Sequence, residues 1–415
     1  MSEWKKFRFD ELCDITRGAS PRPIHDYLGT EGMPWIKIAD ATKASSRFIE
    51  STNARIKLKG VEASVRVYPG DLILSNSATP GIPKFVSIDA CIHDGWMLLR
   101  NFRNLDKNFA YWLLTIQRSN LVAQGNGSVF TNLKTEILKS HIVSIPSTVG
   151  EQKRIAGVLD SIENKIDLNR KINLAIESIA QSHFKDWFID FGPTRTKIIE
   201  QAPYLAPEIW SLFPKKMSAS GIPEGWRIDN LGAHILNFDS KRIPVSGRER
   251  EQRKGPFPYH GATGVMGNID EFLFDGIYLL IGEDGSVMDE NGTAVTQYVW
   301  GKFWANNHAH VLQGKGAVST EQLLLYFKHE TVAPYITGAV QLKLSQGRMN
   351  SMPFLYCGEA LCEKFKEQVS PLFERIRANL EENRTLSSTR DMLLPKLMSG
   401  ELRVKDAAEF VRKTK

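Results

Sequence analysis

The spacing of apolar residues predicts two long helices with nearly the same pattern. Between residues 151 and 188 apolar positions recur three and four apart without any proline, which is typical of a helix that pairs with another helix. The seam consists of Ile155, Leu159, Ile162, Ile166, Asn169, Asn173 and Ile176, and it recurs 210 positions later as Phe365, Val369, Leu372, Ile376, Asn379, Asn383 and Leu386. We predict spacer helices in residues 151–191 and 359–400, and the proline-free part of the first, residues 151–188, corresponds to a rod of about 55 Å.

Two asparagines interrupt each seam, Asn169 and Asn173 in the first helix and Asn379 and Asn383 in the second. A polar residue inside an apolar seam lowers stability but fixes the register of pairing. We predict antiparallel pairing, because each helix follows its own domain, with the amides of one helix facing those of the other. Asparagines that are merely solvated remain the alternative.

Each long helix follows a domain-sized segment of short strand patterns and turns. We predict a first domain at 1–150, a proline-rich linker at 192–222, a second domain at 223–358 and a C-terminal tail at 401–415. Strand patterns lie at 36–38, 65–68, 72–74, 278–281 and 295–299, and shorter helices at 109–117 and 321–329. Trp4 before Leu12 resembles Trp226 before Leu231, which indicates a duplicated domain rather than a solenoid. The expected fold is α+β, with two pseudo-repeated mixed α/β globules separated by two long antiparallel coiled-coil helices.

Composition excludes only a few classes of function. The 415 residues are too many for one ordinary core, and the net charge of +6 permits a nucleic-acid partner without requiring one. No signal peptide and no apolar run of about 20 residues is visible, so we expect no membrane association. Four scattered cysteines fit a reducing compartment and argue against a zinc site. We therefore expect a cytoplasmic protein.

Catalytic motifs are missing from the sequence. It contains no Pro-Pro pair, which the target-amine motif of an adenine methyltransferase requires, and Gly301-Lys302 is followed by Phe303 rather than by the hydroxyl residue of a phosphate-binding loop. His308 and His310 have no evident carboxylate or cysteine partners, so we predict no metal site. The sequence favours a non-catalytic binding protein.

Polar and cationic segments are the candidate DNA-binding residues, because cations contact phosphates and amide, guanidinium or hydroxyl groups read base edges. In the second domain they are the basic loop, with Lys241, Arg242, Arg248, Arg250, Arg253 and Lys254 followed by Tyr259 and His260, and the pre-helix segment, with Gln341, Lys343, Ser345, Gln346, Arg348 and Asn350. In the first domain they are Arg17, Ser20, Arg22, Lys37, Ser75, Asn76, Ser77, Thr79, Gln124, Asn126, Ser128, Thr131, Asn132 and Lys134. Ordinary solvated surface is the alternative for each residue.

Several motifs closely resemble those of the specificity subunit of type I restriction-modification enzymes. The resemblance covers nearly the whole chain and rests on residues 35–38, 151–156, 184–191, 223–226, 285–287, 301–304, 307–309 and 389–397. It implies two target recognition domains, each reading one half of a bipartite, asymmetric site in double-stranded DNA, with the paired helices as the spacer.

The same resemblance implies partners that supply the chemistry. Two modification (methyltransferase) subunits would bring S-adenosylmethionine, and restriction/translocase subunits would bring ATP and Mg, so no cofactor is expected in this prokaryotic chain. Three alternatives stay open: a reader in a related methylation-based defence system without cleavage, a protein-binding coiled-coil scaffold, and a fused methyltransferase or nuclease whose motif is not recognisable.

Overall fold

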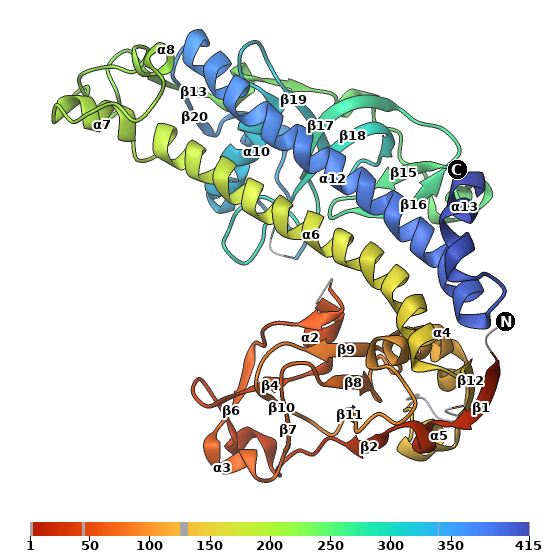
Figure 1. Cartoon of the computed structure of the whole chain (residues 1–415). Coiled ribbons are helices and arrows are strands. Elements are labelled where there is room, and N and C mark those ends of the chain that lie inside the picture. Colours follow the sequence, from red (N-terminus) through yellow and green to blue (C-terminus); the bar gives the residue numbers. More distant parts are fainter. Residues whose placement is uncertain (1–2, 44–45, 125–131, 339, 415) are drawn as a thin grey trace. The chain divides into compact units, whose positions relative to one another are not determined.

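The computed structural model describes residues 3–43, 46–124, 132–338 and 340–414, which form two compact units. The first unit comprises residues 1–170 and 380–415, and the second comprises residues 171–379. The long helices α6 (Val149–Phe188) and α12 (Glu359–Ser399) each contribute to both units (Figure 1). Each unit thus holds one globular domain and part of each long helix, and the α+β class is confirmed.

Two five-stranded sheets form most of the first globular domain. Their strand orders are β3-β6-β4-β10-β7 and β2-β11-β8-β9-β5. The strands are β1 (Trp4–Arg8), β2 (Asp14–Arg17), β3 (Leu28–Gly29), β4 (Met33–Ile36), β5 (Phe48–Ile49), β6 (Ala54–Ile56), β7 (Val65–Val67), β8 (Leu72–Ser75), β9 (Pro83–Val86), β10 (Ala90–Ile92), β11 (Trp96–Arg100) and β12 (Ile142–Pro146). The helices are α1 (Phe9–Leu12), η1 (Ile24–Asp26), α2 (Ile38–Lys43), α3 (Leu58–Val61), α4 (Lys107–Gln124) and α5 (Thr135–Ser140).

The core of the first unit joins its domain to the long helices. Leu113 of α4 and Leu99 of β11 belong to the same buried cluster as Ile155 and Leu159 of α6 and Leu397 of α12. Because burial of apolar surface is the main stabilising term in folding, the domain and these helix ends form one folding unit.

A six-stranded sheet with the order β14-β19-β17-β18-β15-β16 forms the second domain. The strands of this unit are β13 (Arg227–Asn230), β14 (Ile235–Asn237), β15 (Phe257–His260), β16 (Val265–Ile269), β17 (Phe274–Gly282), β18 (Thr296–Ala305), β19 (Ala309–Gly314) and β20 (Pro353–Tyr356). The helices are α7 (Gly192–Ile198), α8 (Pro207–Trp210), η2 (Leu231–Ala233), η3 (Asp239–Lys241), α9 (Gly247–Gln252), α10 (Thr320–His329), η4 (Ala333–Tyr335) and α11 (Gln346–Asn350).

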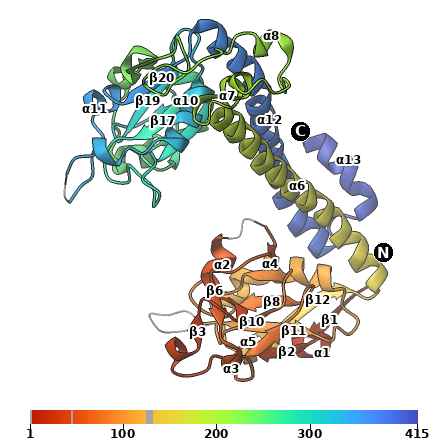
Figure 2. The same ribbon diagram turned by 90° about the vertical axis from the view of Figure 1, so that its left-hand side faces the viewer.

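Both domains close in the same way, although their main sheets differ. In the first unit β1 pairs antiparallel with β12, with Trp4 opposite Pro146 (Figure 2). In the second unit β13 pairs antiparallel with β20, with Arg227 opposite Tyr356. In each case the first strand of the domain lies beside the last strand before a long helix, which supports the predicted duplication.

Within each unit the long helices run antiparallel, as predicted. In the first unit the contacts of Glu163 with Arg390 (2.6 Å) and of Asn169 with Asn383 (2.9 Å) run in opposite directions along the two helices. In the second unit Asn379 Nδ2 donates to Asn173 Oδ1 at 2.7 Å, and Phe188 packs on Phe365. The four asparagines are buried and face one another in pairs.

Three segments differ from the sequence expectations. The linker contains the short helices α7 and α8, because Pro193 and Pro207 occupy first-turn positions where proline is tolerated. The C-terminal tail forms a helix, α13 (Val404–Thr414), whose Ala407 and Phe410 pack on the core of the first unit. The strand predicted at residues 36–38 ends at Ile36, where β4 ends, and Ile38 begins α2.

Asn379→Leu is expected to lower the free energy of unfolding by about 1–3 kcal/mol, because it leaves the buried amide of Asn173 without its partner. The double variant Asn173→Leu, Asn379→Leu is expected to regain this loss, with the register less well specified. Urea denaturation measures both changes, and Glu374→Ala, at an exposed position of α12, is the control. Equal instability of the single and the double variant would show that amide pairing contributes nothing.

Candidate nucleic-acid interface

Three predicted residues of the first unit converge on one acidic residue, Asp94. Ser20 Oγ donates to Asp94 Oδ1 at 2.7 Å, Arg22 Nη2 lies 3.3 Å from Asp94 Oδ2, and Arg17 Nε donates to the Asp94 carbonyl at 3.1 Å. Burial alone would raise the pKa of Asp94, but the hydrogen bond from Ser20 and the nearby positive charges lower it overall. Asp94 therefore orders these side chains as a carboxylate. We call this group the Asp94 cluster.

Strand pairing explains why these residues meet. Arg17, at the end of β2, lies opposite Met97, and Ser75, at the end of β8, lies opposite Trp96. Both strands thus end at the edge of the sheet where β11 begins, two residues after Asp94. Sequence reasoning missed Asp94, because a single acidic residue in a turn carries no local signal.

The predicted turn at residues 75–79 lies at the same edge, but its first two residues are used internally. Ser75 Oγ donates to the Thr79 carbonyl at 2.7 Å and accepts from the Ile82 amide at 2.8 Å. Asn76 is 5% exposed, and its Nδ2 donates to the Asp94 carbonyl at 3.0 Å. Ser75 and Asn76 therefore shape the turn, whereas Ser77 and Thr79 are half-buried.

The remaining candidates of the first unit lie partly at this edge. The Leu133 amide donates to the Asn76 carbonyl at 2.8 Å, which brings the exposed Asn132 and Lys134 beside the turn. Lys37 is exposed between β4 and α2. Gln124 is exposed at the end of α4, with Nε2 3.3 Å from His141 Nδ1. The predicted Asn126, Ser128 and Thr131 lie outside the described residues.

In the second unit two arginines of the basic loop, Arg242 and Arg253, hold the loop in place. Arg242 Nη1 donates to Glu283 Oε2 at 2.7 Å and to the Ala309 carbonyl at 2.7 Å. Arg253 pairs with Asp270 at 2.9 Å and with Glu271 at 2.9 Å, and its guanidinium lies 5.1 Å from the Trp304 ring. These contacts leave Lys241, Arg248 and Lys254 as the exposed cations of the loop.

Arg250 differs from the other loop arginines. Its guanidinium carbon lies 4.7 Å from the Tyr259 ring centroid, while Tyr259 Oη accepts from the Val245 amide at 3.1 Å. Arg250 also lines a pocket of about 440 Å³, and its Nε and Nη1 have no hydrogen-bond partner within the described chain. His260 is buried and bonded to Gln297 at 2.9 Å, so neither His260 nor buried Tyr259 faces solvent.

The pre-helix segment of the second unit meets the basic loop at Glu283. Lys343 Nζ lies 3.5 Å from Glu283 Oε1 and 3.4 Å from Asp284 Oδ1, and the carboxylates raise the pKa of Lys343. Gln341, Gln346 and Arg348 are exposed. The other two predicted residues of the segment, Ser345 and Asn350, are half-buried.

Contrary to the expectation from sequence, His310 has carboxylate partners. Asp239 and Glu283 do lie beside His310, with ligand-type atoms of the three side chains within 4.8 Å of one another. Their donors and acceptors are already engaged, however, because Arg242 pairs with both carboxylates and His310 bonds to Asp239 and to the Leu344 carbonyl. The guanidinium of Arg242 therefore supplies the positive charge that a metal ion would supply to these carboxylates.

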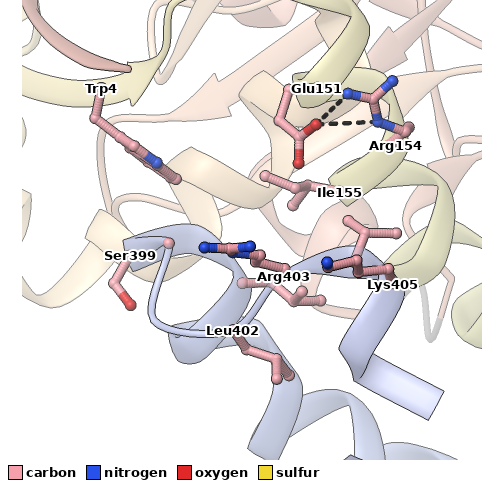
Figure 3. Close-up of a pocket in the computed structure, with 11 residues that line it drawn as sticks. Trp4, Glu151, Arg154, Ile155, Ser399, Leu402, Arg403 and Lys405 are labelled. Atoms are coloured by element: carbon pink, nitrogen blue, oxygen red, sulfur yellow. Dashed lines mark hydrogen bonds and ion pairs between the residues drawn. The ribbon is translucent and has the colours of Figure 1, made fainter. Parts of the chain in front are cut away.

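A larger pocket of about 630 Å³ lies elsewhere in the first unit (Figure 3). It is lined by Trp4, by the first turns of α6 with Glu151 bonded to Arg154, and by the segment from the end of α12 into α13. Among the predicted DNA-binding residues that the structure describes, none lines it. The pocket marks the place where the start of the first domain and the C-terminal residues pack together.

Comparison with known proteins shows which proteins the chain is similar to. Residues 1–178 match the family model described as the type I restriction modification DNA specificity domain. The chain is thus similar to the specificity subunits of type I restriction-modification systems. Within the part of the chain that the structure describes, no helix is long and apolar enough to cross a membrane.

Two specificity subunits of type I restriction enzymes are similar to this chain over almost its full length. The specificity subunit of type I restriction enzyme MjaIX from Methanocaldococcus jannaschii is 26% identical, over 97% of this chain and 94% of the relative. The specificity subunit of type I restriction enzyme HindI from Haemophilus influenzae is 23% identical, over 97% of this chain and all of the relative. The crystal structure of the S subunit from M. genitalium has a TM-score of 0.58 at 16% identity, covering 95% of this chain and 96% of that chain, and it supports the fold.

Arg242→Ala is expected to lower the free energy of unfolding by about 3 kcal/mol, because it removes the guanidinium that pairs with two shielded carboxylates, Asp239 and Glu283. Arg248→Ala removes an exposed cation of the same loop and is expected to change stability by less than about 0.5 kcal/mol. Urea denaturation of the two variants side by side measures the difference. Equal stability of the two variants would contradict the structural role of Arg242.

Proposed function

We propose that this chain is the non-catalytic, DNA-reading subunit of a type I restriction-modification complex. Each domain reads one half of a bipartite, asymmetric site in double-stranded DNA, and the paired helices set the spacing and dock two modification subunits. Methyl transfer from S-adenosylmethionine belongs to those subunits, and ATP- and Mg-dependent translocation and cleavage belong to restriction subunits.

The observation that carries this proposal is that a duplicated fold presents two unlike polar surfaces. Both domains close with the same strand pairing before a long helix. The candidate surface of the first unit is built around Asp94, whereas that of the second is built around Glu283. Two domains that share a fold but present different side chains would bind two DNA half-sites of different sequence, because side chains at the surface read the bases.

The length of the helices suits a spacer between half-sites. α6 has 40 residues, which corresponds to about 60 Å at 1.5 Å per residue. One turn of DNA is about 34–36 Å long, so contacted half-sites would flank base pairs that are not read. The asparagine pairs keep the helices in one register, which would fix the length of the gap.

The test is methylome sequencing of DNA from cells that express this chain with its neighbouring modification subunit. We expect a methyladenine motif of two unlike half-sites around a fixed gap, absent from cells that lack this chain. If the modification subunit folds and binds the chain but no such motif appears, the proposal fails and a scaffold role gains support. Cells with and without the restriction subunit would separate a cleaving system from one that only methylates.

Arg348 and Lys254 are both exposed. Substituting each of them tests whether its side chain contacts a base or a phosphate of the DNA. If Arg348 reads a base, Arg348→Ala should relax one base position at a cost of about 1–3 kcal/mol in binding free energy. Lys254→Ala should instead weaken binding to all sequences alike and flatten the salt dependence by about one unit. Binding titrations of the complex at several salt concentrations measure both effects. Uniform weakening by Arg348→Ala would assign it to the phosphates.

A further inference from the structure

A buried histidine connects the sheet of the second unit to its pre-helix segment. His310, on β19, is 0% exposed. Its Nδ1 lies 2.5 Å from Asp239 Oδ2, and its Nε2 lies 2.7 Å from the carbonyl oxygen of Leu344. Leu344 directly precedes Ser345 and α11, which carries the exposed Gln346 and Arg348. The imidazole is therefore bonded to the backbone of a candidate DNA-reading segment.

These distances define the protonation state of His310. A carbonyl oxygen only accepts, so Nε2 must donate to Leu344. Asp239 Oδ1 accepts from the Val311 amide at 2.9 Å, and although burial would raise the pKa of Asp239, its hydrogen bond with His310 and nearby charges lower it overall. Arg242 Nη2 also lies 3.5 Å from Asp239 Oδ2, and this positive charge favours the carboxylate form of Asp239, to which Nδ1 must donate. An imidazole that donates from both nitrogens is the charged imidazolium.

The surrounding charges keep the pre-helix segment and the basic loop attached to the same site. Glu283 pairs with Arg242 of the basic loop and with Lys343 of the pre-helix segment. The Leu344 amide donates to the Glu283 carbonyl at 2.9 Å, and the Gly285 amide donates to the Leu342 carbonyl at 2.8 Å. We call Asp239, Arg242, Glu283, Asp284, His310 and Lys343 the His310 network.

We infer that protonated His310 is a positioning residue for DNA reading by the second unit, because it fixes the backbone of the segment that carries Gln346 and Arg348. The inference rests on the proposed function and deepens it, since it makes recognition of one half-site depend on a buried proton. A neutral imidazole donates from one nitrogen only and must give up either Asp239 or the Leu344 carbonyl.

The direction of the pH dependence follows from the pKa of His310. Burial lowers this pKa, but the hydrogen bond and charge of Asp239, together with the Leu344 carbonyl, outweigh burial and raise it above its usual value. The ordering effect is therefore fully present below the ordinary histidine pKa of about 6.5 and is lost as the pH rises through the raised value. The other groups that face His310 are Asp239, Glu283 and Arg242, and beyond them lie Lys343, Asp284 and His308.

The first experiment uses the unmodified chain in complex with its modification subunits. Binding to DNA duplexes altered in one or the other half-site is measured between about pH 6 and about pH 9. Discrimination at one half-site should fall by about tenfold toward alkaline pH, the size of a lost base contact, while the other half-site keeps its discrimination. Because no substitution is involved, a folding defect cannot imitate this result.

The second experiment compares His310→Gln with His308→Gln. His308 lies two residues away, with Nδ1 3.6 Å from Asp284 and its side chain 48% exposed. His310→Gln should discriminate poorly at the same half-site at every pH and lose the pH profile, whereas His308→Gln should keep the profile of the unmodified chain. If His308→Gln abolishes the profile, or if His310→Gln keeps it, the inference is wrong.

The outcomes for the proposed function and for this inference are separable. If the unmodified complex discriminates at neither half-site, the proposed function fails. If it discriminates at both, and neither pH nor His310→Gln selectively weakens one of them, only the role of His310 fails.

Discussion

The antiparallel contact between α6 and α12 within each unit is the constraint on which the rest of the structure depends. In the first unit the same helix that pairs through Asn169 also carries buried Asp160, which accepts hydrogen bonds from Arg47, Asn108 and Trp112 of the domain. In the second unit Arg377 of α12 contacts Tyr298, which donates to Glu321 at 2.6 Å. A buried carboxylate is stable only with such partners. The helices therefore pair with each other and also provide the surface on which each domain packs.

The features predicted correctly from sequence were those with a local or repeating signal. The helices and their asparagines follow from a period that lies within one segment, and the duplication follows from its recurrence. The meeting of Arg17, Ser20 and Arg22 at Asp94 could not be predicted, because it depends on which strands become neighbours of β11. Likewise, α13 was missed because its apolar face is short and its partner surface comes from the opposite end of the sequence.

The basic loop shows why the number of cationic residues in a sequence segment overestimates the number that are available to bind DNA. Arginine has a planar group with a fork of donors that suits carboxylates, carbonyls and aromatic rings, and Arg242, Arg250 and Arg253 make such contacts. The acidic partners Asp270 and Glu283 lie well beyond the loop in the sequence, so a local charge count does not include them. The lysines Lys241 and Lys254, whose flexible ammonium groups have no such geometric demand, stay at the surface.

Each candidate surface consists of two kinds of residue: buried or half-buried residues whose hydrogen bonds and ion pairs hold the backbone in place, and exposed side chains carried on that backbone. Asp94 in the first unit and Glu283 with His310 in the second accept or donate several bonds at once, so their positions tolerate little change. Asn132, Lys134, Gln346 and Arg348 are exposed on the backbone that these residues order. A substitution at an exposed position changes the side chains that the surface presents and leaves those hydrogen bonds and ion pairs intact, whereas a substitution among the buried or half-buried residues displaces a whole segment. The side chains that each surface presents can therefore change without loss of the fold, provided that the buried charges beneath them remain paired.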